Sequence, residues 1–81
     1  MNQLAEELKE VVGNYTDYYK VTYHLLNHKD FVQLYIQDIP SPLMYDIIVV
    51  SKSLNYGFII KNAIYLNRLD LNIKLEFYKT L

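Results

Sequence analysis

The chain has 81 residues, no cysteine and a net charge of −1 at neutral pH. This length suits one domain and is too short for two, so residues 1–81 are expected to form a single domain. The lack of cysteine excludes a disulfide framework, a thiolate zinc site and a thiol nucleophile, and the balanced charge argues against a broad basic surface for nucleic acid.

The hydrophobic content is high for such a short chain. Hydrophobic residues make up 52% of the sequence, slightly above the usual range, although a small domain has proportionally more surface. A partner or a second copy is the simplest cover for the surplus apolar surface. The longest apolar run near the middle covers only residues 47–50, far fewer than the ~20 residues of a membrane helix.

Composition also bears on location and origin. The N-terminus lacks the basic and apolar regions of a signal peptide, so the cytoplasm is the expected location. Nine tyrosines and only two glycines are typical of AT-rich genes such as those of many phages. The expected setting is therefore the cytoplasm, or the host cytoplasm for a viral protein.

The first expected element is a helix over residues 2–12. Leu4, Leu8 and Val12 recur at the spacing of one apolar helix face. Gly13 is a typical stop because glycine readily adopts the left-handed conformation after a helix.

Residues 15–26 can be read in two ways. As a strand, Tyr19 and Val21 point to one side while Lys20 and Thr22 point to the other. As a helix, the same segment also has an apolar stripe. The content of tyrosine, threonine and valine favours the strand, and residues 27–30 then form a tight turn.

Three further strands are expected in the middle of the chain. Residues 31–39 alternate between apolar and polar side chains until Pro40 and Pro42 end the strand. Residues 43–51 contain a β-branched run, which predicts a largely buried strand. After a turn at residues 55–57, residues 58–66 follow as another strand, with a helix as the less favoured reading.

Residues 69–78 give the most regular alternation in the chain. Leu71, Ile73 and Leu75 alternate with Asn72 and Lys74, which predicts a strand with one dry and one wet face. The sequence thus predicts an α+β domain with one N-terminal helix packed on an antiparallel sheet. That sheet has about four to five strands, and short connections favour a meander.

No side chains suggest catalysis. His24, His28 and Asp30 resemble metal ligands, but on a strand the two histidines lie roughly 13 Å apart. The serines lie in no nucleophile motif, and two glycines are too few for a phosphate-binding loop. The prediction is a non-enzymatic protein with no catalytic residues, no metal and no cofactor.

A tyrosine-bearing face of the sheet is the candidate binding surface. Tyrosine is enriched at protein interfaces because it offers a large contact area with a polar tip. The predicted partner-binding residues are Tyr18, Thr22, His24, Gln33, Tyr35 and Gln37. Packing between neighbouring strands is the plain alternative. Stacking of single-stranded bases beside Lys20 is another, although scattered lysines make nucleic acid an unlikely partner.

Residues 44–51 and 58–66 are apolar on both strand faces, so either a second layer or a second copy must cover them. The predicted dimer or buried interface consists of Ile47, Val49, Phe58 and Ile60. The function predicted from sequence is a homodimeric protein-interaction module, such as a phage accessory or inhibitor protein that binds a partner protein. The alternatives are a single-stranded nucleic-acid-binding protein and a small metal protein or enzyme.

Overall fold

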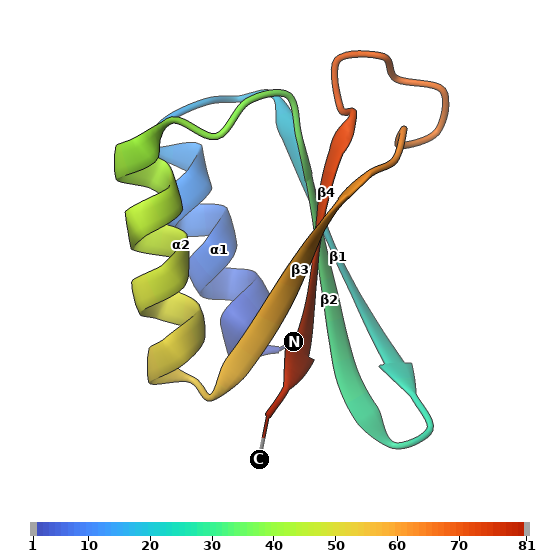
Figure 1. The fold of residues 1–81 in the computed structure, drawn as a ribbon. Coiled ribbons are helices and arrows are strands. Elements are labelled where there is room, and N and C mark those ends of the chain that lie inside the picture. The colour runs from blue at the N-terminus through green and yellow to red at the C-terminus, as the bar shows by residue number, and fades with distance from the viewer. Residues whose placement is uncertain (1, 81) are drawn as a thin grey trace.

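The computed structural model describes residues 2–80. Along the chain, the elements are α1 (Gln3–Gly13), β1 (Tyr19–Leu26), β2 (Lys29–Ile36), α2 (Ser41–Ser53), β3 (Tyr56–Asn62) and β4 (Ile73–Lys79). The four strands form one antiparallel sheet in the order β1-β2-β4-β3. Both helices lie on the same face of this sheet (Figure 1). Neither helix in this part of the chain is long and apolar enough to cross a membrane.

The α+β class and the antiparallel sheet are confirmed, but the predicted meander with a single helix is wrong. The chain leaves β2, passes through α2 and returns as β3 at the edge of the sheet. The last strand, β4, then inserts between β2 and β3. Moving β4 to the front of the chain would turn this order into the β-α-β-β-α-β order of the ferredoxin-like arrangement.

The predicted strand over residues 43–51 is wrong, because this segment lies within α2. Leu43, Ile47 and Ser51 are buried at every fourth position, which is the spacing of one helix face. Pro42 lies in the first turn, where its missing amide hydrogen costs nothing. The β-branched run opposes the helix by only a fraction of a kcal/mol per residue. Burial of each large apolar side chain contributes about 1.5–3 kcal/mol, so packing prevails.

The remaining segments follow the predictions with shifted boundaries. The helix near the N-terminus and the strand reading of residues 15–26 are confirmed, and the strand begins at Tyr19. Strand β2 ends at Ile36 and β3 at Asn62, earlier than predicted. The last strand begins only at Ile73, since residues 63–72 form a loop in which Leu69 is 78% exposed.

The two hairpin turns show why these boundaries lie where they do. Asn27 and His28 both have positive φ and join β1 to β2, as in a two-residue type I′ turn. Leu66 and Asn67 also have positive φ, within the β3–β4 loop. This second turn is closed by the amide of Arg68, which donates to the Tyr65 carbonyl at 2.8 Å. The loop therefore has its own hydrogen bonds.

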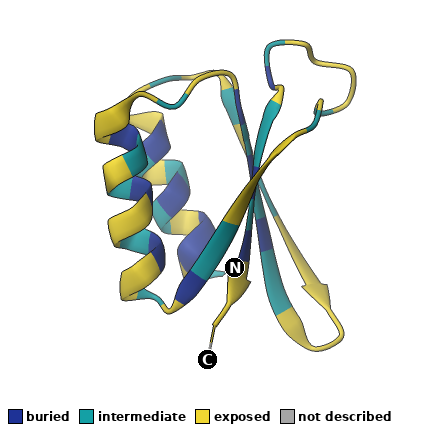
Figure 2. Cartoon of the chain, in the orientation of Figure 1, coloured by how far each residue is buried: buried dark blue, intermediate teal, exposed yellow. Residues whose placement is uncertain are grey.

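The core fills the space between the helices and the covered face of the sheet (Figure 2). Leu34, Leu75 and Phe77 of the two central strands are fully buried against Leu8 and Ile47 of the helices. No buried side-chain nitrogen or oxygen in residues 2–80 lacks a hydrogen-bond partner. The core is mainly apolar, and its buried polar side chain, Ser51, donates to the Ile48 carbonyl at 3.1 Å.

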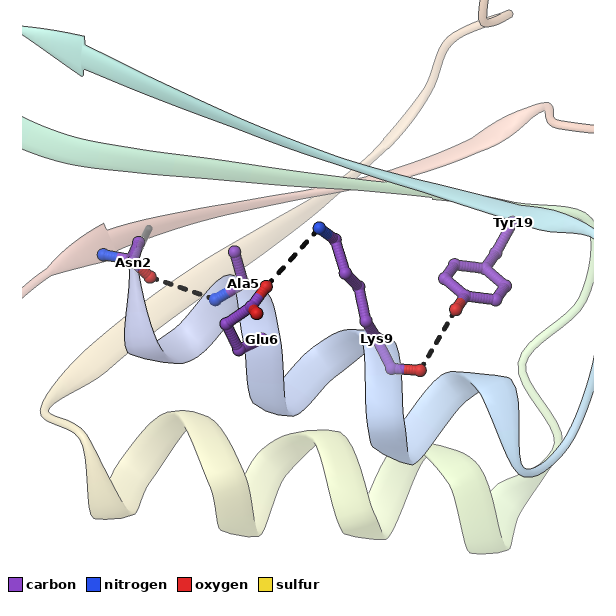
Figure 3. Close-up of polar contacts among 5 residues, drawn as sticks. All are labelled: Asn2, Ala5, Glu6, Lys9 and Tyr19. Atoms are coloured by element: carbon purple, nitrogen blue, oxygen red, sulfur yellow. Dashed lines mark hydrogen bonds and ion pairs between the residues drawn. The ribbon is translucent and has the colours of Figure 1, made fainter.

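Local polar contacts fix α1 at both ends (Figure 3). The Asn2 side chain accepts a hydrogen bond from the Ala5 amide at 3.0 Å, which caps the helix N-terminus. Lys9 pairs with Glu6 at 3.5 Å on the exposed side. The Tyr19 hydroxyl donates to the Lys9 carbonyl at 3.1 Å. This last bond ties the end of α1 to the start of β1 and orients the edge of the sheet.

Candidate functional site

The face of the sheet opposite the helices is the main candidate for a binding site. Val32, Leu34 and Ile36 of β2 point into the core, so the residues between them point to the opposite side. The strand register extends this assignment to the other three strands. We call the resulting surface the open face. It contains three rows of side chains that run across all four strands, and Leu26 and Lys29 lie beyond them at the end of the first hairpin.

The first row carries most of the charge, and we call it the basic row. Its members in sheet order are Lys20, Tyr35, Lys74 and Lys61. The Lys74 ammonium lies 5.9 Å from the centre of the Tyr35 ring. From the β3–β4 loop, the Tyr65 ring also packs on Tyr35, with a centroid distance of 4.8 Å. Tyr35 therefore contacts both a cation and a second ring.

In the second row, three polar side chains are joined by hydrogen bonds and an isoleucine lies at the end, and we call it the polar row. Its members are Thr22, Gln33, Glu76 and Ile59. The Thr22 hydroxyl donates to the Gln33 carbonyl oxygen at 3.2 Å, and the Gln33 amide donates to Glu76 at 3.4 Å. Each bond joins neighbouring strands, so the row fixes the direction of the Gln33 amide.

Glu76 links the polar row to the basic row. Its carboxylate lies 2.8 Å from the Lys61 ammonium and 3.1 Å from the Lys74 ammonium. The hydrogen bond from Lys61, aided by that from Lys74, lowers the pKa of Glu76 below its usual value although burial opposes this. Glu76 thus stays ionised at neutral pH, where it balances about one of the two positive charges.

The third row contains two exposed rings, His24 and Tyr78, and the half-buried ring of Phe31, and we call it the aromatic row. His24, Phe31 and Tyr78 lie side by side on β1, β2 and β4, next to Gly57 on β3. The centroids of His24 and Phe31 are 6.4 Å apart, and Tyr78 is 44% exposed. A Cβ on Gly57 would lie 3.6 Å from the Tyr78 ring. This is an ordinary contact distance, so the Tyr78 ring packs along the β3 backbone at Gly57.

Charge is strongly segregated between the two sides of the sheet. Lys20, Lys29, Lys61 and Lys74 lie on the open face, where Glu76 is the sole acidic residue of the strands. The whole chain has a net charge of −1, so the rest of the molecule is net negative. The open face is a locally basic surface on a slightly acidic protein.

A second polar cluster lies at the opposite side of the sheet, near the start of α1. The Asp30 carboxylate accepts hydrogen bonds from the hydroxyls of Tyr23 at 2.8 Å and Tyr56 at 3.3 Å. The Asn2 amide donates to the Tyr56 hydroxyl at 3.0 Å. These groups line a hollow of about 360 Å³ beside Lys79, whose ammonium lies 4.9 Å from the centre of the Tyr56 ring.

The pKa values of this cluster follow its hydrogen bonds. Burial is the main cause that raises the pKa of the Tyr56 hydroxyl above its usual value, and the bond from Asn2 partly opposes it. For Tyr23, the hydrogen bond to Asp30 is the main cause of a raised pKa. Both phenols are therefore neutral donors to a carboxylate, which suits a structural tie between α1, the first hairpin and β3.

The structure brings together four of the six predicted partner-binding residues. Thr22, His24, Gln33 and Tyr35 all lie on the open face. Tyr18 precedes β1 and Gln37 follows β2, and both line a separate hollow of about 250 Å³ at the end of the sheet.

The four residues of the predicted dimer or buried interface separate into two groups. Ile47 is buried in the core, and Phe58 is partly buried against it. Val49 of α2 and Ile60 of β3 are exposed. Val49 and Ile60 are therefore the most accessible of the four to a second copy, Phe58 is partly accessible, and Ile47 is not accessible.

The geometry removes the basis of a metal site at the two histidines. His24 lies on the open face, whereas Asp30 points to the helix side and His28 lies in the turn. The carboxylate and the His24 ring are thus on opposite faces of the sheet. Within residues 2–80, no three histidine or carboxylate side chains are placed to share an ion.

Sequence reasoning missed several open-face residues that the register brings together. Lys61 and Glu76 are 15 positions apart in sequence but form the shortest ion pair on this face. Phe31 was also missed, and it pairs with Tyr78, which the alternation of the last strand already places on the polar side. The alternation of each strand places these residues on a wet face. Nothing in the sequence indicates that these strands are neighbours.

The sequence matches no protein-family model. Comparisons with curated proteins and with solved structures likewise find no match. The function is therefore inferred from the side chains of the open face.

Proposed function

We propose that this protein is a non-enzymatic interaction module that binds another macromolecule through the open face. The observation that carries the proposal is that both helices cover one face of the sheet. The other face displays exposed rings next to lysines. Aromatic side chains are enriched in binding surfaces, and a cluster of lysines attracts partners of opposite charge. The sequence-based prediction of a partner protein rests on a face rich in tyrosine and amide side chains, and it treats the lysines as scattered.

The polar contacts also favour binding over chemistry. Asp30 accepts hydrogen bonds from two tyrosines, and Glu76 is paired with two lysines. A catalytic acid or base needs a pKa near the working pH and a free approach to the substrate. Glu76 instead has a lowered pKa and is held by its neighbours, as expected for a carboxylate that organises a surface.

A capture experiment with matched variants tests the use of the open face. We expect the wild-type protein, immobilised in a lysate of its source cells, to retain macromolecules that the double variant Lys20→Glu/Tyr78→Ala loses. The control Lys52→Glu/Tyr45→Ala makes the same two changes on α2, away from the open face. Equal retention by both double variants, or equal loss from both, would contradict the proposal.

We propose that two copies pair along the free edge of β3. The Thr80 amide donates to the Asn55 carbonyl at 2.8 Å, and the Ala63 amide donates to the Asn72 carbonyl at 3.2 Å. Odd-numbered residues of β3 therefore direct their backbone groups toward β4, and even-numbered residues direct theirs to the free edge. Four residues can pair there: Tyr56, Phe58, Ile60 and Asn62.

The side chains of this edge are self-complementary. Antiparallel pairing centred on Ile59 places Phe58 opposite Ile60 of the second copy and Lys61 opposite its Gly57. Apolar side chains then meet apolar ones, and the two Lys61 ammonium groups stay apart. The dimer would cover Ile60, which is 55% exposed, and would join the two open faces into one surface.

Light scattering after size-exclusion chromatography checks the dimer. We expect the wild type to have twice the mass of one chain and Ile60→Lys to be monomeric, because a lysine on a strand edge opposes pairing. Ile64→Lys in the β3–β4 loop places the same charge on another exposed isoleucine and should stay dimeric. A monomeric wild type at all concentrations, or a dimeric Ile60→Lys variant, would rule out this edge.

We place the action of the protein in the cytoplasm, and the phage or mobile-element origin stays a prediction from composition. The chain has no cysteine, so its folding needs no oxidising compartment. Microscopy of a fluorescent fusion in the source cells would check the location.

A further inference from the structure

We propose that the partner of the open face is a single-stranded nucleic acid. This inference rests on the proposed function, because it names the class of macromolecule that the same surface binds. It follows from the charge of the face, the position of its rings and its shape. The net charge of −1 and the scattered positions of the lysines describe the whole chain. Binding depends on the charge of the local surface instead.

The charge of the open face is complementary to a phosphate backbone. Lys20, Lys61 and Lys74 lie in one row across three of the four strands, with Lys29 beyond the aromatic row. Lys20 makes no ion pair within residues 2–80, while Lys61 and Lys74 share the single carboxylate of Glu76. Positive charge is therefore in excess on this face, and contacts with phosphates would release counterions.

The rings of the open face are placed to stack on bases. Phe31 and Tyr78 are directly paired on the two central strands, and His24 lies next to Phe31. Unlike Phe77 and Phe58, which pack in or against the core, these rings lie on the side of the sheet that no helix covers. Bases stack on such aromatic side chains with little sequence preference.

The position of the rows favours a single strand over a duplex or an acidic peptide. The basic row and the aromatic row are four residues apart along β2, or about 13 Å. One extended strand can thus place phosphates near the lysines and bases on the rings. A duplex hides the faces of its bases. An acidic peptide offers charge without flat rings for stacking on Phe31 and Tyr78.

Fluorescence anisotropy with labelled oligo(dT), oligo(U) and a DNA duplex of equal length tests the inference. We expect both single strands to bind more tightly than the duplex. The logarithm of the association constant should fall with the logarithm of the salt concentration, with a slope between about −2 and −3 for three to four lysines. Lys20→Gln should weaken binding and reduce that slope by about 0.7.

The aromatic contribution is tested separately. Tyr78→Leu keeps an apolar side chain over Gly57 but removes the flat ring, so it should weaken binding about ten-fold and leave the salt slope unchanged. The matched controls on α2, Lys52→Gln and Tyr45→Leu, remove the same groups from the other side of the sheet and should change neither quantity. Circular dichroism of each variant checks that it is folded.

Three results would overturn the inference. They are no binding of either single strand at low salt, equal or tighter binding of the duplex, and the same loss in the α2 controls as in the open-face variants. If single strands do not bind but capture from lysate still depends on the open face, the partner is a protein and the proposed function stands. If capture is also independent of this face, both proposals fail.

Discussion

Phe77→Ala is expected to lower the free energy of unfolding by about 3–5 kcal/mol, since large-to-small changes in a core remove buried area and leave a cavity. Phe77 has no exposed surface and lies on the central strand β4, where its ring centroid is 5.1 Å from that of Phe58. A small domain has only about 5–15 kcal/mol of stability in total. The melting temperature should therefore fall by more than about 12 °C, as measured by circular dichroism.

An exposed aromatic residue on a helix provides the control for this prediction. Tyr45 on α2 is 67% exposed, so Tyr45→Ala should change stability by no more than about 0.5 kcal/mol. Similar melting temperatures for the two variants would mean that β4 is not the centre of the core. The register of β4 between β2 and β3 would then be incorrect.

Asp30→Ala is expected to lower the free energy of unfolding by about 1.5–3 kcal/mol, because hydrogen bonds to a charged group are stronger than neutral ones. The change leaves the Tyr56 hydroxyl without its acceptor, and Tyr56 is only 5% exposed. Loss of the Tyr56 bond removes the tie between the first hairpin and β3, and loss of the Tyr23 bond removes a contact between β1 and β2 within the hairpin. Thermal unfolding measures the loss, and Asp17→Ala, an exposed carboxylate between α1 and β1, should leave the melting temperature unchanged.

The pH dependence of stability separates this tie from a general effect of charge. The pKa values of Tyr23 and Tyr56 are raised above 10.0 in the folded protein. Their contribution to stability is therefore fully present below pH ~10 and is lost as the pH rises through the raised values. In Asp30→Ala, the pKa of Tyr23 should return toward its usual value because Asp30 is the main cause of its shift. That of Tyr56 should stay raised by burial.

NMR titration of the tyrosine ring carbons checks this difference between the two phenols. If the pKa of Tyr23 were unchanged in Asp30→Ala, the hydrogen bond between these residues would be absent in solution. The cluster would then contribute to stability through packing alone. The hollow beside Lys79 would also be open to another occupant.

The sequence correctly predicted the helices and strands in which the spacing of apolar side chains and the backbone preference of the residues favour the same structure. Residues 2–12 carry an apolar stripe, and α1 spans nearly the same residues. The expected left-handed stop at Gly13 is wrong, because Gly13 is the last helical residue, has no positive φ and is followed by Asn14 as the C-cap. In β1 and β2, β-branched and aromatic residues alternate with polar ones, so the two faces of each strand are assigned correctly. Four residues of the candidate binding surface followed from that alternation: Thr22, His24, Gln33 and Tyr35.

Where local backbone preference or alternation favours one structure and tertiary packing or a turn favours another, the local preference did not determine the fold. Residues 47–50 are β-branched and favour a strand, but Leu43, Ile47 and Ser51 bury one helix face against the sheet. Leu69 and Leu71 continue the alternation of β4, but the turn at Leu66 and Asn67 keeps them in the loop. Tertiary burial outweighs local preference because each buried side chain contributes more than a residue's propensity.

The sequence by itself determined the class of the domain, the first helix, the first hairpin and the absence of thiol chemistry. These features depend on side chains close together along the chain, where periodicity and turn residues act directly. Only the tertiary structure decided that β4 lies between β2 and β3. That one pairing brings Lys61, Lys74 and Glu76 beside Tyr35 and places Tyr78 beside Phe31. Strand order depends on how α2 packs across the sheet, so lysines scattered in sequence form a single basic face in space.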